Sequence, residues 1–201
     1  YFTSRWPHEP VDFTGKRVGI IGTGSTGIQT IPIVAAQAAH LTVFQRTPNY
    51  SVPARNRVLT QAERDEFQQN FAFYRNGACT SNAGHLPRAP GPHEDEIGTD
   101  EKALVDAFKV HIAQGGFGFL QNFQSVMVDQ KLNDAMANAV RDHIKSIVKD
   151  PEVAEELLPF DHPVGTKRPC LDTNYYETYN RDNVTLVNIR KNPIERVTKD
   201  A

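Results

Sequence analysis

Two short apolar runs stand out near the start of the chain. The first covers residues 16–22 and the second covers residues 41–45. Predominantly apolar runs of this length are typical of parallel strands that are buried on both faces. Between them, apolar side chains recur at helical spacing over residues 25–40. The pattern predicts strand, turn, helix and strand, which together form a βαβ unit and indicate an α/β fold.

Helical patterns replace strand patterns from about residue 60. Thr60 and Glu63 have the spacing of a capping box, which predicts the start of a helix, and Gly77 can end that helix. Residues 80–99 are rich in Gly, Pro, Ser and Asn, so we expect a loop there.

Two further helices are expected over residues 100–114 and 130–149, on either side of the glycine- and phenylalanine-rich residues 115–119. Asp150 and Pro151 are typical of an N-cap followed by the first helical position. They predict one more short helix, which continues through Leu158.

Strand patterns return over residues 184–188 and 194–198, after the helical block. The helices therefore interrupt an α/β domain rather than follow it. We expect a Rossmann-like dinucleotide-binding domain made of residues 1–59 and 159–201, with a helical insertion over residues 60–158.

The composition is that of an ordinary globular protein. The chain has 201 residues, of which 39% are hydrophobic, and 22 basic residues nearly balance 24 acidic ones. Such a balance provides no field for a nucleic acid backbone or an anionic membrane surface. The longest apolar runs are strand-sized and far below the roughly 20 residues that span a bilayer. We expect neither nucleic acid nor membrane as a partner.

The two cysteines, Cys79 and Cys170, lie in unrelated contexts without CxxC or histidine spacing. This spacing supports neither a disulfide scaffold nor a metal site, and a cytoplasmic location is expected. The chain starts abruptly at Tyr1 and stops at Ala201, directly after a strand pattern. We therefore expect a segment of a longer protein.

A GxGxxG motif lies between the first predicted strand and the first predicted helix. The first glycine permits a tight turn, the second lets the backbone approach a pyrophosphate, and the third allows close helix packing. The helix N-terminus adds N–H donors and a positive dipole. Together with a glutamine in the helix, the motif provides these candidate cofactor contacts: Gly22, Thr23, Gly24, Ser25, Thr26, Gly27 and Gln29.

The end of the second predicted strand indicates which dinucleotide binds. Sites for NAD or FAD place an acidic residue here for the ribose hydroxyls, whereas an arginine accommodates the 2′-phosphate of NADP. This chain has Arg46 and Thr47 at that position and no acid. A guanidinium can bind the phosphate through two charge-assisted hydrogen bonds, and a hydroxyl can add a third. NADP(H) is therefore the predicted cofactor.

Other residues are weaker candidates. Lys167 and Arg168 follow a glycine turn, but on its own such a pair is more often a solvated surface feature. His162 beside Asp161 is expected to form a local hydrogen-bonded pair. Tyr175, Tyr176 and Tyr179 have helical spacing and are expected in the core. Residues 117–123 could face a substrate, another domain or the core, and the core is favoured.

Several separated motifs together resemble the Baeyer-Villiger monooxygenases. The resemblance is strong at both ends of the chain and weaker within the predicted insertion. It rests on Trp6-Pro7, the segment from Asp12 to Val18, the glycine turn, the segment from Phe44 to Pro48, Val52 to Arg55, Gly165 to Pro169, and Asn180 to Val184.

The resemblance implies a two-dinucleotide enzyme. In this family NADPH reduces FAD, the reduced flavin captures O₂, and the resulting peroxyflavin converts a ketone into an ester or lactone. By likeness, Arg46 and Lys167 would hold the 2′-phosphate of NADP, and the catalytic residue Arg168 would stabilise negative charge beside the flavin. The protein positions the cofactors, which supply the chemistry.

The chain departs from the family pattern at two points. Phe2 occupies the position of the histidine in the family fingerprint, and the glycine turn that binds FAD is absent. The chain alone is therefore expected to bind NADP(H) and to oxygenate nothing. Two alternatives stay open: a related flavin monooxygenase that oxidises nitrogen or sulfur, and a free-standing NADP(H)-binding module. Trp6-Pro7 and residues 165–169 favour the Baeyer-Villiger interpretation.

Overall fold

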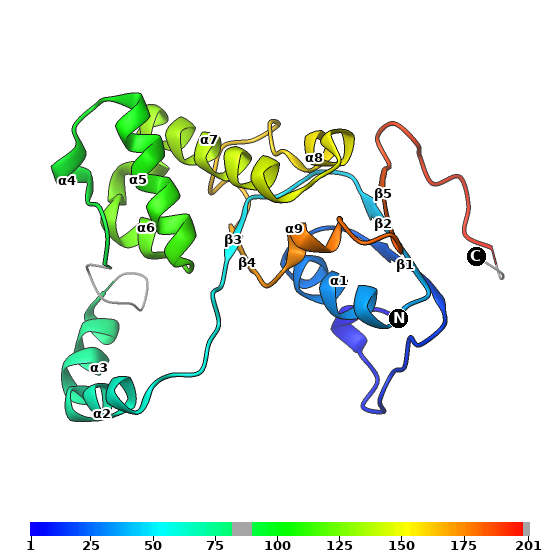
Figure 1. Cartoon of the computed structure of the whole chain (residues 1–201), viewed down its shortest axis with the longest axis horizontal. Helices are drawn as coiled ribbons and strands as arrows, with labels where there is room; N and C mark the ends of the chain where they lie inside the picture. Colours follow the sequence, from blue (N-terminus) through cyan, green and yellow to red (C-terminus); the bar gives the residue numbers. More distant parts are fainter. Residues whose placement is uncertain (82–89, 199–201) are drawn as a thin grey trace. The chain divides into compact units, whose positions relative to one another are not determined.

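The computed structural model describes residues 1–81 and 90–198 (Figure 1). The chain forms two compact units. The first contains residues 1–52 together with the chain from residue 140 onward, and the second contains residues 53–139. The first unit is mixed α/β with a parallel sheet, and the second is helical.

The parallel sheet is the centre of the first unit. Its strands follow the order β1-β2-β5, with bounds β1 (Arg17–Ile21), β2 (His40–Gln45) and β5 (Val184–Asn188). Ile20 pairs with Val43, which pairs in turn with Leu186. Helix α1 (Ser25–Gln37) connects β1 to β2. The predicted βαβ unit is confirmed, and so is the predicted strand over residues 184–188.

One face of this sheet is well covered and the other is open. Leu41 and Val43 of β2 are fully buried, and α1, which contacts β1 and β2, buries Ile28, Ile31 and Val34. The prediction that the first strand is buried on both faces is wrong, because Ile21 is 66% exposed. In the described part of the chain β1 pairs only with β2, and strand side chains alternate between the two faces.

Shorter elements complete the first unit. They are η1 (Thr3–Arg5), α8 (Pro151–Leu157), β4 (Cys170–Asp172) and α9 (Tyr175–Thr178), and β4 pairs with β3 (Ser51–Pro53). Asp150 accepts hydrogen bonds from the N–H groups of Glu152 and Val153, which confirms the predicted N-cap of α8. The core position predicted for the tyrosines is also confirmed: Tyr175, Tyr176 and Tyr179 are buried.

The second unit consists of helices. They are α2 (Gln61–Gln69), α3 (Phe71–Thr80), α4 (Glu94–Ile97), α5 (Glu101–Gln114), α6 (Gly118–Asn122), η2 (Gln124–Met127) and the first part of α7 (Gln130–Ile147). The predicted capping box is confirmed, since Thr60 and Glu63 exchange hydrogen bonds at the start of α2. Phe108 and Phe123 pack with ring centroids 4.5 Å apart, and Phe119 is also buried, so residues 117–123 contribute to the core.

Three predicted boundaries are wrong. Gly77 ends no helix, because α2 ends at Gln69 and α3, which contains Gly77, continues to Thr80. The predicted loop over residues 80–99 contains α4, and residues 82–89 lie outside the described residues. Residues 194–198 form no strand, and their exposed backbone has no neighbouring strand to pair with among the described residues.

No helix in the described ranges combines the length and apolarity needed to cross a membrane. The same residues contain no group of three or more His, Cys, Asp or Glu side chains placed to hold a metal ion. Cys79 is exposed and Cys170 is buried, and both are free thiols.

Candidate functional site

The glycine turn between β1 and α1 has the geometry that a dinucleotide requires. Gly22 has φ +102°, a left-handed conformation that side chains disfavour. A Cβ on Gly27 would overlap the carbonyl oxygen of Gly22, so the helix packs against the turn as closely as backbone allows. A Cβ on Gly24, by contrast, would meet nothing within 4 Å. The turn is therefore tight on its inner side and open where a pyrophosphate would approach.

The first turn of α1 adds donors to this open side. Gly24 is the N-cap of the helix and provides no side-chain hydrogen bond to the first-turn N–H groups. Uncapped N–H groups and the helix dipole make such an end a site for anions. Ser25 and Thr26 are exposed in this turn, and Gln29 is exposed one turn further along.

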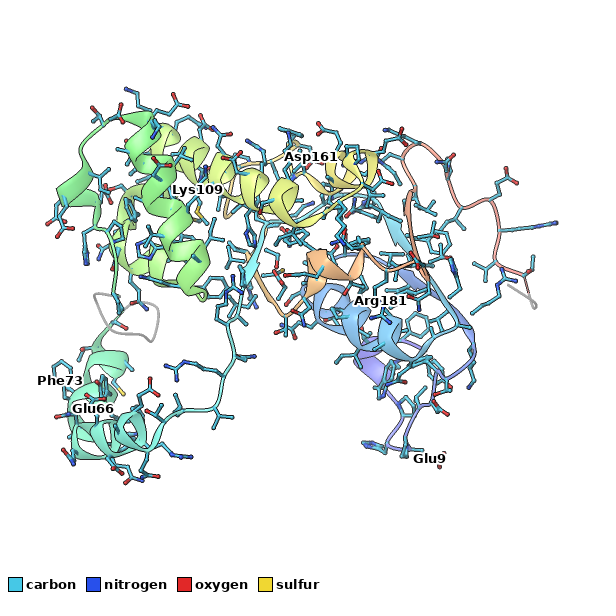
Figure 2. All side chains as sticks on the ribbon, viewed as in Figure 1. Glu9, Glu66, Phe73, Lys109, Asp161 and Arg181 are labelled. Carbon is cyan, nitrogen blue, oxygen red and sulfur yellow. The ribbon has the colours of Figure 1, made fainter. Side chains whose placement is uncertain are left out.

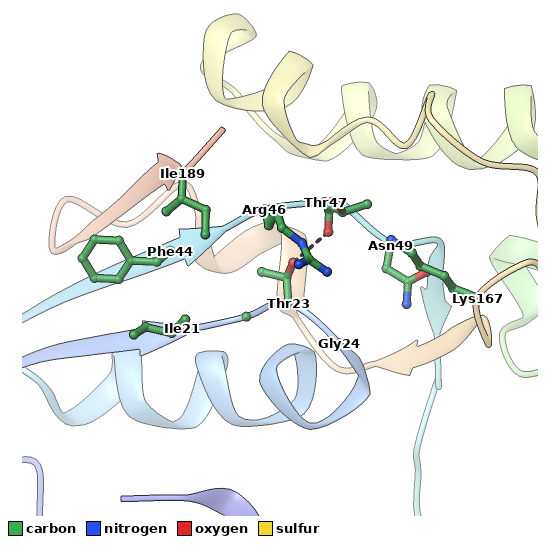
Figure 3. Close-up of a pocket in the computed structure, with 10 residues that line it drawn as sticks. Ile21, Thr23, Gly24, Phe44, Arg46, Thr47, Asn49, Lys167 and Ile189 are labelled. Atoms are coloured by element: carbon green, nitrogen blue, oxygen red, sulfur yellow. Dashed lines mark hydrogen bonds between the residues drawn. The ribbon is translucent and has the colours of Figure 1, made fainter. Parts of the chain in front are cut away.

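A pocket of about 330 Å³ lies beside the turn, at the carboxyl ends of the parallel strands (Figure 3). Ligands of open α/β sheets bind at this edge. Figure 3 shows apolar side chains at one end of the pocket, Arg46 with Thr23 and Thr47 at its centre, and Asn49 with Lys167 at the other end. The lining residues are Ile21, Gly22, Thr23, Gly24, Phe44, Arg46, Thr47, Asn49, Lys167 and Ile189.

The end of β2 supplies the centre of the pocket. The hydroxyl of Thr23 donates to the carbonyl oxygen of Thr47 at 3.2 Å, which ties the glycine turn to the residues that follow β2. Arg46 is exposed. For the described part of the chain, no hydrogen bond or ion pair involves the side chains of Arg46 or Lys167. Two cations at the pocket are thus left without an anionic partner.

The loop with Lys167 and Arg168 is held to the pocket through its backbone. Asn49 donates from Nδ2 to the carbonyl oxygen of Arg168 and to the sulfur of Cys170, each at 3.3 Å. Burial raises the pKa of the Cys170 thiol, so the sulfur stays protonated and neutral. The Arg168 side chain is exposed and is not part of the pocket lining.

Asp172, a buried carboxyl, lies on β4, the strand that begins at Cys170. Asp172 accepts a hydrogen bond from the Ser51 hydroxyl at 2.6 Å and a longer one from the Tyr175 N–H at 3.4 Å. Burial raises the pKa of Asp172 despite these bonds. The pair joins β3 to β4 and so fixes the strand that follows the Lys167 loop.

The pocket brings together most of the predicted site residues. Its lining includes these six: Gly22, Thr23, Gly24, Arg46, Thr47 and Lys167. Ser25, Thr26 and Gly27 lie in the adjoining first turn of α1, while Gln29 and Arg168 lie outside the lining.

Sequence reasoning missed several residues at this edge. Asn49 and Ile189 line the pocket, and Arg190 contacts Thr47. The strand pattern over residues 184–188 could have indicated the last two, because residues that directly follow neighbouring parallel strands meet at one edge of a sheet. For Asn49, no comparable signal exists.

The Asp161–His162 pair was predicted as local and is confirmed, with His162 Nδ1 and Asp161 Oδ1 at 2.6 Å. Asp161 also accepts a hydrogen bond from Arg190 at 2.8 Å. The contact with His162, followed by that with Arg190, lowers the pKa of Asp161. This carboxylate is therefore charged at neutral pH, at a position next to the pocket.

Known proteins resemble this chain over nearly its whole length, although no protein-family model matches it. It is 42% identical to the 2-oxo-Δ³-4,5,5-trimethylcyclopentenylacetyl-CoA monooxygenase of Pseudomonas putida, over 100% of the chain and 38% of that protein. It is 41% identical to a Baeyer-Villiger monooxygenase of Pseudooceanicola batsensis, over 98% of the chain and 35% of that protein. A phenazine N-monooxygenase of Lysobacter antibioticus is 39% identical over 98% of the chain and 36% of its own length.

Solved structures agree. A steroid monooxygenase bound to NADP matches 94% of the chain with a TM-score of 0.84 and 46% identity. OTEMO in complex with FAD and NADP matches 98% of the chain with a TM-score of 0.87 and 40% identity. The chain spans 36% and 39% of these two structures, little more than a third of each. Sequence and fold lead to one conclusion: the chain is homologous, over nearly its whole length, to about a third of a Baeyer-Villiger monooxygenase.

Proposed function

We propose that this chain is the NADP(H)-binding part of an FAD-dependent Baeyer-Villiger monooxygenase that converts ketones into esters or lactones with O₂. The observation that carries the proposal is the pairing of an open glycine turn with the unpartnered cation Arg46 in one pocket. The ketone, O₂ and FAD belong to the complete enzyme, for which we propose a cytoplasmic location. The relatives named above support this reaction class.

The domain organisation is part of the same proposal. Residues 1–59 and 159–201 would form a Rossmann-like NADP-binding domain, and residues 60–158 would be a helical insertion. The parallel pairing of β2 with β5 supports this organisation, because those strands lie on either side of the insertion in sequence. The helical composition of the second unit supports it as well.

Each part of the pocket would contact a different part of NADP(H). The backbone of residues 22–27 and the first turn of α1 would hold the pyrophosphate, with Gln29 further along the helix. Arg46 and Lys167 would hold the 2′-phosphate, and Thr47 would add a hydroxyl. A phosphate there would give both cations the anionic partner that no described residue provides.

Arg168 would act beside the flavin rather than in the NADP pocket. Bound FAD would supply the chemistry that activates O₂. The exposed guanidinium of Arg168 would stabilise the negative charge that develops there, for which a permanently charged side chain is suited. Its position outside the pocket lining, on a backbone held by Asn49, supports a role distinct from that of Lys167.

Oxidation of a nitrogen atom is a second candidate reaction. The identity of 39% with a phenazine N-monooxygenase favours it specifically. Both reactions need the same NADP(H) site, so the pocket supports them equally. Incubation of the complete enzyme with a cyclic ketone and with an aromatic N-heterocycle separates them by product: an ester or lactone in one case and an N-oxide in the other.

We expect Arg46→Ala to weaken NADP⁺ binding by roughly tenfold to hundredfold, the value of lost charge-assisted hydrogen bonds. Binding of NAD⁺, which has no 2′-phosphate, should stay nearly unchanged. Calorimetric titration of both dinucleotides measures the two effects. Arg17→Ala is a matched control, because Arg17 is an exposed arginine at the opposite end of β1. Equal losses for both dinucleotides in the Arg46 variant would contradict the assignment.

A further inference from the structure

Arg190 links three segments that meet at the edge of the sheet. It comes just after β5 and next to Ile189, whose N–H donates to the carbonyl oxygen of Gln45 at 2.9 Å. Its Nη2 donates to the hydroxyl of Thr47 at 2.9 Å and to Oδ2 of Asp161 at 2.8 Å. Thr47 follows β2, and Asp161 lies on the segment after α8 (Figure 2).

The contact with Arg190 leaves the proton of the Thr47 hydroxyl available for another acceptor. A hydroxyl has one proton, and its oxygen accepts here from a guanidinium that cannot lose its own protons. The Thr47 proton is therefore free to point elsewhere, and Thr47 lines the pocket. Phosphate oxygens only accept hydrogen bonds. Arg190 thus prepares Thr47 as a donor to an anion in the pocket, beside Arg46.

Asp161 holds Arg190 in this position. One carboxylate oxygen binds His162 and the other binds Arg190. The His162 ring packs edge-on against the ring of Tyr50, with centroids 5.3 Å apart, and Tyr50 is buried. The anchor of the guanidinium is therefore fixed on a packed part of the first unit. The Arg190 side chain stays 54% exposed, so its remaining N–H groups can reach an incoming oxygen.

We propose that Arg190 is a specificity-determining residue of the NADP(H) site, with Asp161 as its positioning residue. Arg190 orients the Thr47 hydroxyl toward the 2′-phosphate and adds a second guanidinium beside Arg46. The inference rests on the proposed NADP(H) function. It goes beyond that function by assigning cofactor selection to a residue that lies after β5, outside the pocket lining and outside the glycine motif.

The test compares NADP⁺ and NAD⁺ affinities of variants by calorimetry. We expect Arg190→Ala to weaken NADP⁺ binding by about tenfold and to leave NAD⁺ binding nearly unchanged. Arg190→Lys, which keeps a cationic donor, should restore part of the loss. Thr47→Val should cost less in the Arg190→Ala background than in the wild type, because the two residues act through one hydrogen bond. Lys191→Ala is the control, since the neighbouring Lys191 pairs with Glu156 instead.

The outcomes separate this inference from the proposed function. An unchanged NADP⁺ to NAD⁺ affinity ratio in Arg190→Ala, with a wild type that prefers NADP⁺, would overturn the role of Arg190 alone. A wild type without that preference would remove the NADP(H) function itself. Thermal unfolding shows whether each variant folds. Should Arg190→Ala not fold, Arg190→Met keeps the length of the side chain without a donor or a charge, and an unchanged ratio there would overturn the role equally.

Discussion

Gly27→Ala is expected to destabilise the chain and to abolish dinucleotide binding. The added methyl group would overlap the carbonyl oxygen of Gly22, which is backbone and cannot rotate away. Either α1 shifts from β1 or the turn opens. Overpacking of this kind costs about 1–3 kcal/mol in free energy of unfolding. A loss of that size lowers the melting temperature by about 2–4 °C per kcal/mol in a chain of this length.

Gly24→Ala provides the matched control. A Cβ at Gly24 meets nothing within 4 Å, and the residue has φ −79° and ψ −176°, which alanine adopts freely. A smaller unfolded-state entropy offsets the weaker N-cap, so stability should change little. The methyl group would nevertheless occupy the space where a pyrophosphate approaches, and binding should weaken. Native stability with native binding in Gly27→Ala would contradict the close packing of this turn.

The second large effect concerns Arg168 in the complete enzyme. We expect Arg168→Ala to reduce ester formation by about 10²–10³-fold, the usual cost of removing one preorganised group that stabilises a developing anion. NADPH binding should persist, because the Arg168 side chain lies outside the pocket lining and Asn49 holds the backbone carbonyl that the substitution retains. The yield of ester for each NADPH consumed measures the effect.

Lys167→Ala is the control for this prediction. Lys167 carries the same charge one residue earlier and lines the pocket. Its loss should weaken NADPH binding and leave the yield of ester for each NADPH nearly unchanged. An Arg168→Ala enzyme that still converts ketones with the normal yield would refute the proposed role of Arg168.

Local sequence signals predicted the glycine turn and the start of α8 well. The GxGxxG motif needs only six consecutive residues, and its glycines have the conformations and contacts that the motif requires. The N-cap at Asp150 is similarly local, because the accepting carboxylate and the donating N–H groups are separated by only two or three residues. The functional roles assigned to Arg46, Lys167 and Arg168 stay predictions.

Contacts between residues that are far apart in the chain could not be predicted from the sequence. Arg190 is 143 residues from its partner Thr47, and no spacing rule connects them. The burial predicted for β1 failed for the same reason, since apolar content cannot show whether a second layer covers Ile21. The segment over residues 194–198 is rich in β-branched residues, which favour strands, but a strand also needs a neighbour, and the described residues provide none.

Side-by-side calorimetric titration of this chain with NADP⁺ and NAD⁺ is the direct test of whether the pocket at the glycine turn selects NADP(H). The salt concentration must be the same in both, because screening weakens contacts between cations and phosphate. We expect tighter binding of NADP⁺, since of the two dinucleotides only NADP⁺ has a 2′-phosphate to pair with Arg46 and Lys167. Equal affinities for the two dinucleotides, or binding of neither, would contradict it.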